Sequence, residues 1–149
     1  MAYKDIYESW KRDPDAFWME QAKAIDWDEM PSKALFDGNA PLYEWFADGM
    51  VNTCYNAVDR HVEQGRGDQV VIIHDSPVTH TKHEITYKEL RDRVASLAGA
   101  LRAKGIEKGD RVGIAARNSA NWIIAYMGVI MAGGCATLLN GWWTGEEMA

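Results

Sequence analysis

The chain has 149 residues, enough for one ordinary domain, and its 47% hydrophobic and 26% charged content excludes wholesale disorder. The net charge of −6 argues against nucleic acid as a partner, because proteins that bind the phosphate backbone usually carry a basic patch. The basic side chains of Lys88, Arg91 and Arg93 stand among Glu89 and Asp92, which indicates a solvated helix face instead.

Residues 1–51 form an aromatic-rich lead-in. Four of the seven tryptophans lie in it, namely Trp10, Trp18, Trp27 and Trp45. The pattern predicts two short helices, over 3–12 and 15–25, with Asp13 capping the second and Pro14 at its first position. No sustained period follows over 26–51, so we expect an irregular segment whose aromatic side chains pack onto something larger.

Regular patterning begins after the lead-in. Residues 54–64 predict a helix closed by Gly65 and Gly67. The β-branched run at 69–75 predicts a strand, and EIT at 84–86 can return as the second strand of a hairpin.

The clearest helix signal starts at Thr86, which forms a capping box with Glu89. Apolar residues then recur at helical spacing from Leu90 to Leu101, with charged residues on the opposite face. Gly105 lies where the cap at the end of a helix belongs.

Two apolar strands flank an apolar helix in the last third of the chain. Residues 111–116 and 135–140 predict the strands, and 120–132 predict a buried helix between them. This order is a βαβ unit, which implies a right-handed crossover and parallel pairing, in a sheet covered on both faces. The fold class is therefore α/β: a helical and irregular lead-in, then a partial sheet.

The uncharged run 122–139 is nearly long enough to cross a bilayer. Gly133 and Gly134 interrupt it, so we expect a buried helix and strand rather than a membrane span. Cys54 and Cys135 have no Cys-x-x-Cys partner, and no apolar secretory signal opens the chain, so the expected location is the cytoplasm.

A nucleotide site is the first chemistry to test in a βαβ unit. The loop after the first strand, ARNSANW, has neither the Rossmann glycine fingerprint nor the Walker lysine loop. The helix N-terminus at Ser119 is able to bind phosphate, but a simple helix cap by Asn118 or Ser119 is favoured.

Two further clusters are weak candidates. His80-x-x-His83 could direct two imidazoles at one metal, but strong sites use three or four ligands, and a polar turn has the same composition. Asp59, Arg60 and His61 are adjacent on a helix, so their side chains diverge and cannot converge on one substrate atom. We therefore assign no catalytic, cofactor-binding or metal-binding residue.

Three long stretches nevertheless resemble the amino-terminal part of AMP-forming acyl-CoA synthetases. They are YESWKRDPDAFW (7–18), PLYEWFADGMVNTCYNAVDRHVEQGRGDQVVII (41–73) and ITYKELRDRVASLAGALRAKGIEKGDRVGI (85–114). The likeness is closest to the acetyl- and propionyl-CoA synthetase branch. The last third is more similar to ligases of medium-chain, long-chain or broad specificity, so the acyl chain length stays open.

This resemblance implies a ligase that converts a carboxylate, ATP and coenzyme A into acyl-CoA, AMP and pyrophosphate, with Mg²⁺ screening the phosphates. The family's Ser/Thr/Gly-rich phosphate loop and catalytic lysine have no counterpart here, so we expect the chain to be catalytically incomplete and to bind none of these cofactors alone. Residues 52–149 then correspond to the first portion of the adenylating domain. The expected partner is the remainder of the ligase chain.

The last ten residues, NGWWTGEEMA, contain a second capping box, formed by Thr144 and Glu147. We expect it to open a helix whose body lies beyond residue 149, with Trp142 and Trp143 in a core completed elsewhere. The alternative is a free-standing binding or interaction module on a ligase-derived scaffold, and a metal-binding hairpin protein ranks below it.

Overall fold

The chain divides into two compact units, and the computed structural model describes residues 2–148. The units are Met1–Asn52 and Thr53–Ala149. Eleven Asp and Glu against five Lys and Arg give the first unit the whole net charge of −6, whereas the second has eleven of each kind. Within residues 2–148, every helix is too short or too polar to span a bilayer.

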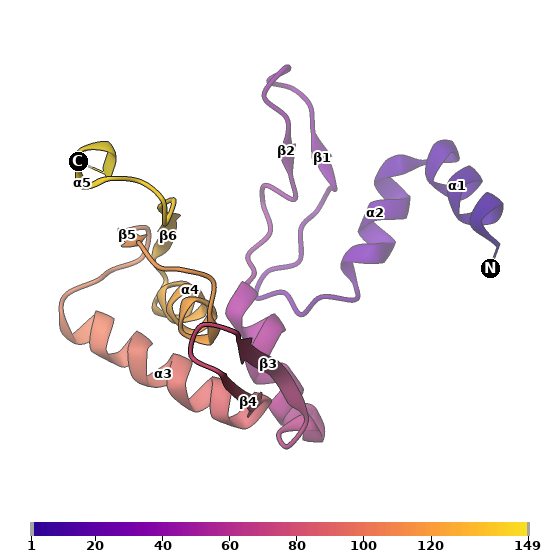
Figure 1. The fold of residues 1–149 in the computed structure, drawn as a ribbon. Helices are drawn as coiled ribbons and strands as arrows, with labels where there is room; N and C mark the ends of the chain where they lie inside the picture. Colours follow the sequence, from indigo (N-terminus) through magenta and orange to yellow (C-terminus); the bar gives the residue numbers. More distant parts are fainter. Residues whose placement is uncertain (1, 149) are drawn as a thin grey trace. The chain divides into compact units, whose positions relative to one another are not determined.

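The first unit opens with two short helices, α1 (Tyr3–Arg12) and α2 (Pro14–Ala22) (Figure 1). The predicted cap is confirmed, because the Asp13 carboxylate accepts a hydrogen bond from the Ala16 N–H at 3.0 Å. The second helix ends three residues earlier than expected. There the Trp27 indole Nε1 donates to the Ala22 carbonyl at 2.8 Å.

The segment after α2 is mostly irregular, as the sequence predicts. Two strands of two residues each pair antiparallel in it, β1 (Leu35–Phe36) and β2 (Glu44–Trp45). The ring of Trp18 meets that of Trp45 edge-on, with 5.9 Å between centroids, and Trp27 lies 5.6 Å from Phe46. Within this unit the aromatic side chains thus pack on one another.

The second unit begins with a helical segment that contains two π-helical stretches, η1 (Tyr55–Asp59) and η2 (Val62–Arg66). Sequence patterning predicted the helix but not its wider turns. Gly65 has φ of +80°, a left-handed conformation that glycine adopts without steric cost, so the backbone leaves the helical path there.

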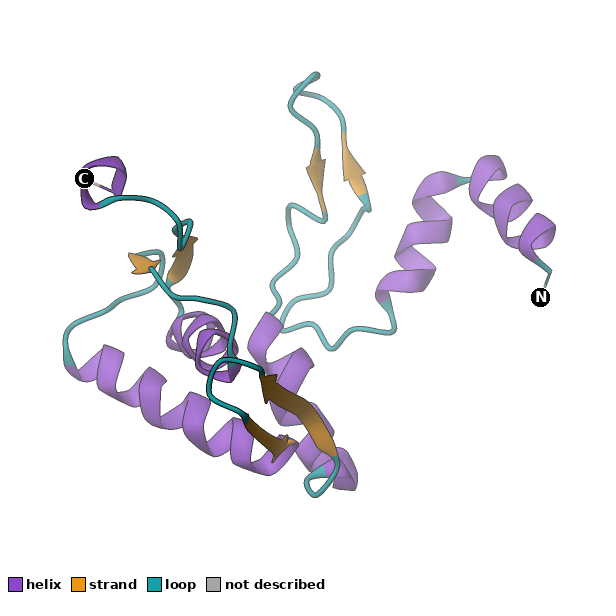
Figure 2. Ribbon diagram, viewed as in Figure 1, coloured by secondary structure: helices purple, strands orange, loops and turns teal. Residues whose placement is uncertain are grey.

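An antiparallel hairpin follows, made of β3 (Val70–Ser76) and β4 (Thr81–Thr86) (Figure 2). Its register is irregular between Val70 and Ile72 and regular from there to the turn. Ile85 on β4 is fully buried, so one face of the hairpin reaches the core.

The long helix α3 (Tyr87–Ala103) begins at the predicted capping box. The Glu89 N–H donates to the Thr86 hydroxyl at 3.3 Å, and the Thr86 N–H donates to the Glu89 carboxylate at 2.8 Å. That backbone hydrogen bond lowers the pKa of Glu89. Gly105, with φ of +89°, follows the end of the helix as predicted.

The predicted βαβ unit is confirmed, and with it the α/β class. Strands β5 (Arg111–Ile114) and β6 (Cys135–Leu138) pair in parallel, and α4 (Ala120–Ala132) connects them. Gly133, with φ of +91°, ends the helix. We expected both faces of the sheet to be covered. Within residues 2–148 they are not, because three of the four β6 residues are exposed.

The core of this unit lies where α3 and α4 pack together beside the hairpin and the first helical segment. Its buried members are Cys54, Val58, Ile85, Leu90, Val94 and Ala120. The two helices approach closely at Gly128, where a Cβ atom would lie only 2.7 Å from Leu97 Cδ2. The space at this crossing therefore fits glycine but not a larger residue, unless Leu97 moves.

The described chain ends in the short helix α5 (Gly145–Met148). Its capping box is confirmed, since Thr144 N–H donates to Glu147 at 2.8 Å and Glu147 N–H donates to the Thr144 hydroxyl at 3.4 Å. Trp142 is 90% exposed and Trp143 is 42% exposed. Residues 2–148 thus do not supply the core that was expected around them.

Candidate functional site

Two hollows in the second unit meet at the loop between β5 and the start of α4. Both are lined by Asn118, from the loop, and by Trp122, from the first turn of the helix. Ligands of open α/β sheets bind outside the carboxyl ends of the strands, and this loop leaves the carboxyl end of β5. The position makes the loop the candidate site.

The first hollow, of about 580 Å³, lies where both parallel strands end. Leu138, Asn140 and Trp142 line its β6 side, and Arg117 is the one charged side chain among the described residues that line it. The Trp122 ring stacks on Tyr126, with 5.6 Å between centroids and 5° between planes, which fixes one wall. A hollow of mixed polarity that contains one guanidinium suits a small organic anion better than a cation.

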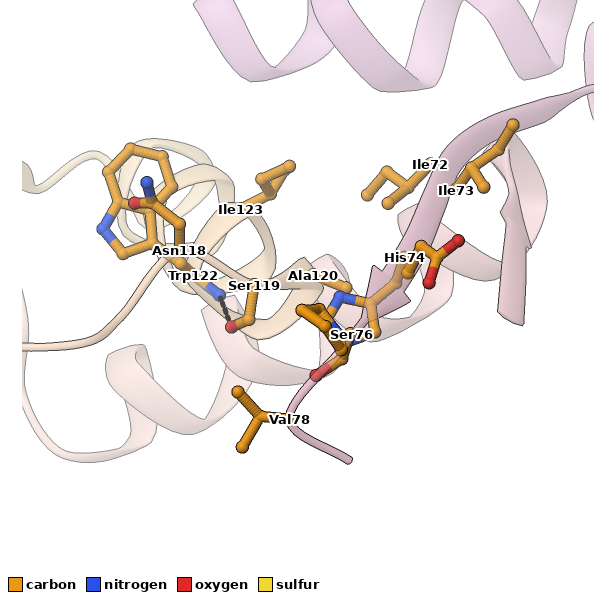
Figure 3. A pocket seen from close by; sticks show the side chains of 12 residues that line it. Ile72, Ile73, His74, Ser76, Val78, Asn118, Ser119, Ala120, Trp122 and Ile123 are labelled. Atoms are coloured by element: carbon orange, nitrogen blue, oxygen red, sulfur yellow. Dashed lines mark hydrogen bonds between the residues drawn. The ribbon is translucent and has the colours of Figure 1, made fainter. Parts of the chain in front are cut away.

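The second hollow, of about 540 Å³, lies between the hairpin and the start of α4 (Figure 3). Residues 72–78 line one side, and residues 118–120 together with Trp122 and Ile123 line the other. Hydrophobic side chains form most of this wall, and His74 and Asp75 contribute the ionisable groups.

Ser119, the residue considered for phosphate binding, acts as the cap of α4. Its hydroxyl accepts a hydrogen bond from the Trp122 N–H at 3.3 Å, as the dashed line in Figure 3 shows. The predicted helix cap is therefore confirmed and assigned to Ser119 rather than Asn118. This hydroxyl satisfies one of the free N–H groups that would otherwise face an anion.

The histidines are arranged differently from the weak candidate pair His80 and His83, to which the sequence analysis assigned no metal. His80 lies in the turn with φ of +53°, outside β4, whereas His83 is on the strand directly opposite His74. Among the described residues, no group of three or more His, Cys, Asp and Glu side chains gathers around a common point as a metal site. In the structure the cross-strand neighbour of His83 is thus His74.

Asp59, Arg60 and His61 make separate contacts, which confirms that they do not converge. Burial raises the pKa of the Asp59 carboxyl, and Arg60 Nη1 donates to the Asn56 side chain at 3.1 Å. The His61 ring packs against Tyr87 at 4.8 Å between centroids, and its Nδ1 lies 3.0 Å from Arg66 Nη1. Desolvation, followed by the nearby Arg66 and Arg60 charges, lowers the pKa of His61.

The two cysteines are both free thiols, one buried and the other exposed. Cys54 belongs to the core, and burial raises the pKa of its thiol to about 12, with a further contribution from the Asp59 carboxylate. A thiol of that pKa is almost entirely protonated near neutral pH, so Cys54 is not an activated nucleophile. Cys135 is exposed at the start of β6.

Comparison with known proteins covers both units. The family described as acetyl-coenzyme A synthetase N-terminus matches residues 3–57, and the family of AMP-binding enzymes matches residues 58–149. Because the second match spans more than half of the chain, the protein belongs to the AMP-binding enzyme family.

Relatives from animals and bacteria are similar along most of the chain. A mitochondrial acyl-CoA synthetase short-chain family member 3 from Bos taurus is 40% identical over 99% of this chain. The corresponding Homo sapiens protein is 48% identical over 74% of the chain. An acetyl-coenzyme A synthetase from Streptomyces coelicolor is 37% identical over 97% of it.

The matched region is a small part of each relative. The chain spans 21% of the bovine protein, 16% of the human one and 22% of the Streptomyces one. It covers the amino-terminal part of these synthetases, as the resemblance predicted. The βαβ unit and the loop at its centre therefore correspond to the amino-terminal section of these much longer relatives.

Sequence reasoning expected a cap of α4 by Asn118 or Ser119, of which Ser119 is the cap, but it missed the two hollows around this residue. The signal available in the sequence was the polar loop directly after a predicted parallel strand, which places Arg117 and Asn118 at a carboxyl end. No pattern in the sequence gives the separation between the hairpin and α4, because that separation depends on how α3 packs.

Proposed function

We propose that the chain is the amino-terminal section of an AMP-forming acyl-CoA synthetase that activates a short- to medium-chain carboxylic acid. The observation that carries this proposal is the unbroken succession of the two family matches, over residues 3–57 and 58–149. Relatives whose names specify acetyl-coenzyme A and short-chain acyl-CoA synthetases support a small acyl group.

The complete enzyme would join the acid to AMP from ATP, release pyrophosphate, and transfer the acyl group to the thiol of coenzyme A. Mg²⁺ would screen the phosphates during the first step. Adenylation requires prearranged donors around the phosphates, and we place those donors outside this chain. The contribution of residues 52–149 is structural, as the first portion of the adenylating domain, with residues 1–51 as its lead-in.

The remainder of the ligase is the partner in this proposal. Exposed apolar residues on β6 and after it, including Leu138 and Trp142, support such a partner, because large apolar side chains gain free energy when they are covered. The proposed location is the cytoplasm, where free thiols such as Cys54 and Cys135 persist.

An ATP–pyrophosphate exchange assay tests the proposal. The chain replaces the matched section of the bovine relative, to which it is 40% identical, in a chimera assayed with acetate and with propionate. We expect exchange by the chimera and none by the 149-residue chain or by the bovine protein lacking that section. Robust exchange by the 149-residue chain alone would contradict catalytic incompleteness, and a folded but inactive chimera would contradict the assigned role.

A further inference from the structure

The hairpin of β3 and β4 brings two histidines together on one face. His74 is the direct cross-strand partner of His83, and their ring centroids are 4.8 Å apart with 40° between the planes. Side chains alternate between the two faces of a hairpin. The neighbouring pairs, Asp75 with Lys82 and Ile73 with Glu84, therefore lie on the opposite face, and no carboxylate from those pairs competes for the imidazoles.

This pair of imidazoles lies at the border between core and solvent. The next cross-strand pair on the same face contains the buried Ile85, whereas His83 is exposed. His74 is half-buried and lines the hollow of about 540 Å³ beside α4 (Figure 3). Across residues 2–148, neither ring is hydrogen-bonded to another protein group, which leaves ring nitrogens for a ligand.

We propose that His74 and His83 form a two-imidazole binding site for a divalent first-row transition ion. Neutral imidazole is a preferred ligand of Zn²⁺ and Cu²⁺, at metal–nitrogen distances of about 2.0–2.1 Å. Two nitrogens on one such ion are roughly 3 Å apart. Rings whose centroids are 4.8 Å apart reach that separation by small rotations about their side-chain bonds.

The site is open, because the protein supplies two ligands and water must complete the coordination. The hollow beside His74 has room for that water. A site with two protein ligands binds more weakly than a closed structural zinc site with four, so the ion exchanges readily. Cu²⁺ should bind more tightly than Zn²⁺, and Mg²⁺ should not bind, because it prefers oxygen ligands.

Replacing each histidine in turn tests the assignment, since the chain contains four. The background variant is Cys135→Ser, which removes the exposed thiol as a competing ligand. Zn²⁺ titrated calorimetrically into the 149-residue chain should bind with a stoichiometry of one. His74→Gln and His83→Gln should each weaken binding at least tenfold, whereas the matched controls His80→Gln and His61→Gln should leave it unchanged.

Circular dichroism of each variant separates loss of the ligand from loss of the fold. If His74→Gln unfolds the hairpin, the exposed His83→Gln decides the outcome. Absence of stoichiometric Zn²⁺ binding by the background protein overturns the proposal. Binding that survives both His74→Gln and His83→Gln, binding that requires His80, or equal binding of Mg²⁺ overturns it as well.

Discussion

At the scale of single residues, the tightest constraint on the second unit is the contact of Gly128 with Leu97. A methyl group on Gly128 would meet three atoms of the Leu97 side chain at 2.7–3.1 Å. Gly128→Ala therefore forces α3 and α4 apart or moves Leu97 off its rotamer. We expect the free energy of unfolding, measured by urea titration, to fall by about 1–3 kcal/mol.

Gly99 on α3 is the matched control, because a Cβ atom there meets nothing within 4 Å. Gly99→Ala should raise the free energy of unfolding by about 0.5–1 kcal/mol, since alanine loses less backbone entropy than glycine inside a helix. A loss of stability in both variants would show that the α3–α4 crossing is not the cause of the Gly128 effect.

Residue-level predictions from the sequence succeeded where the chemistry is local. Asp13 and Ser119 cap the helices that begin one residue later, because a cap depends only on side chains within one helical turn. The pairing of His74 with His83 escaped prediction, since it depends on the register of the hairpin. The sequence spacing pointed instead to His80, which lies in the turn.

At the scale of elements, long periodic segments were predicted best. α4 occupies 120–132 as predicted, because its apolar run is bounded by a cap and by two glycines. The π-helical stretches between Tyr55 and Arg66 and the two-residue strands of the first unit had no sequence signal. Such features arise when tertiary packing overrides local propensity.

The two capping boxes of the second unit allow a matched test of what a cap contributes. Thr86→Ala removes the cap of α3, the helix that forms one side of the core, and should lower the free energy of unfolding by about 0.5–2 kcal/mol. Thr144→Ala removes the same hydrogen bond from α5, a helix of four exposed residues. This substitution should leave the free energy of unfolding nearly unchanged.

Thermal unfolding followed by circular dichroism measures both capping variants. The difference between them arises from packing, because the local geometry of the two boxes is similar. Equal destabilisation by the two substitutions would contradict this account and would mean that α5 unfolds together with the core.

At the scale of the whole molecule, exposed apolar side chains distinguish a section of a ligase from a free-standing module. In the second unit they include Ile73, Val78, Leu138 and Trp142. Isolated residues of this kind are ordinary, but a surface that a partner normally covers binds apolar dyes strongly. We expect stronger fluorescence of such a dye, per molecule, with the 149-residue chain than with the chimera.

Light scattering on the same samples supplies the control, because self-association would also hide apolar surface. A compact monomer that binds little dye would favour the free-standing module. In that case the exposed apolar residues would not be a surface that further strands of a longer chain cover.

The unequal division of charge between the two units also affects how charged molecules in solution approach each unit. A unit with a net charge of −6 repels polyanions, over a range of about 8 Å at physiological ionic strength. The second unit has no net charge and carries Arg117 beside its hollow. We therefore expect dissolved polyanions to approach the second unit more readily than the first, and raising the salt concentration should weaken that difference.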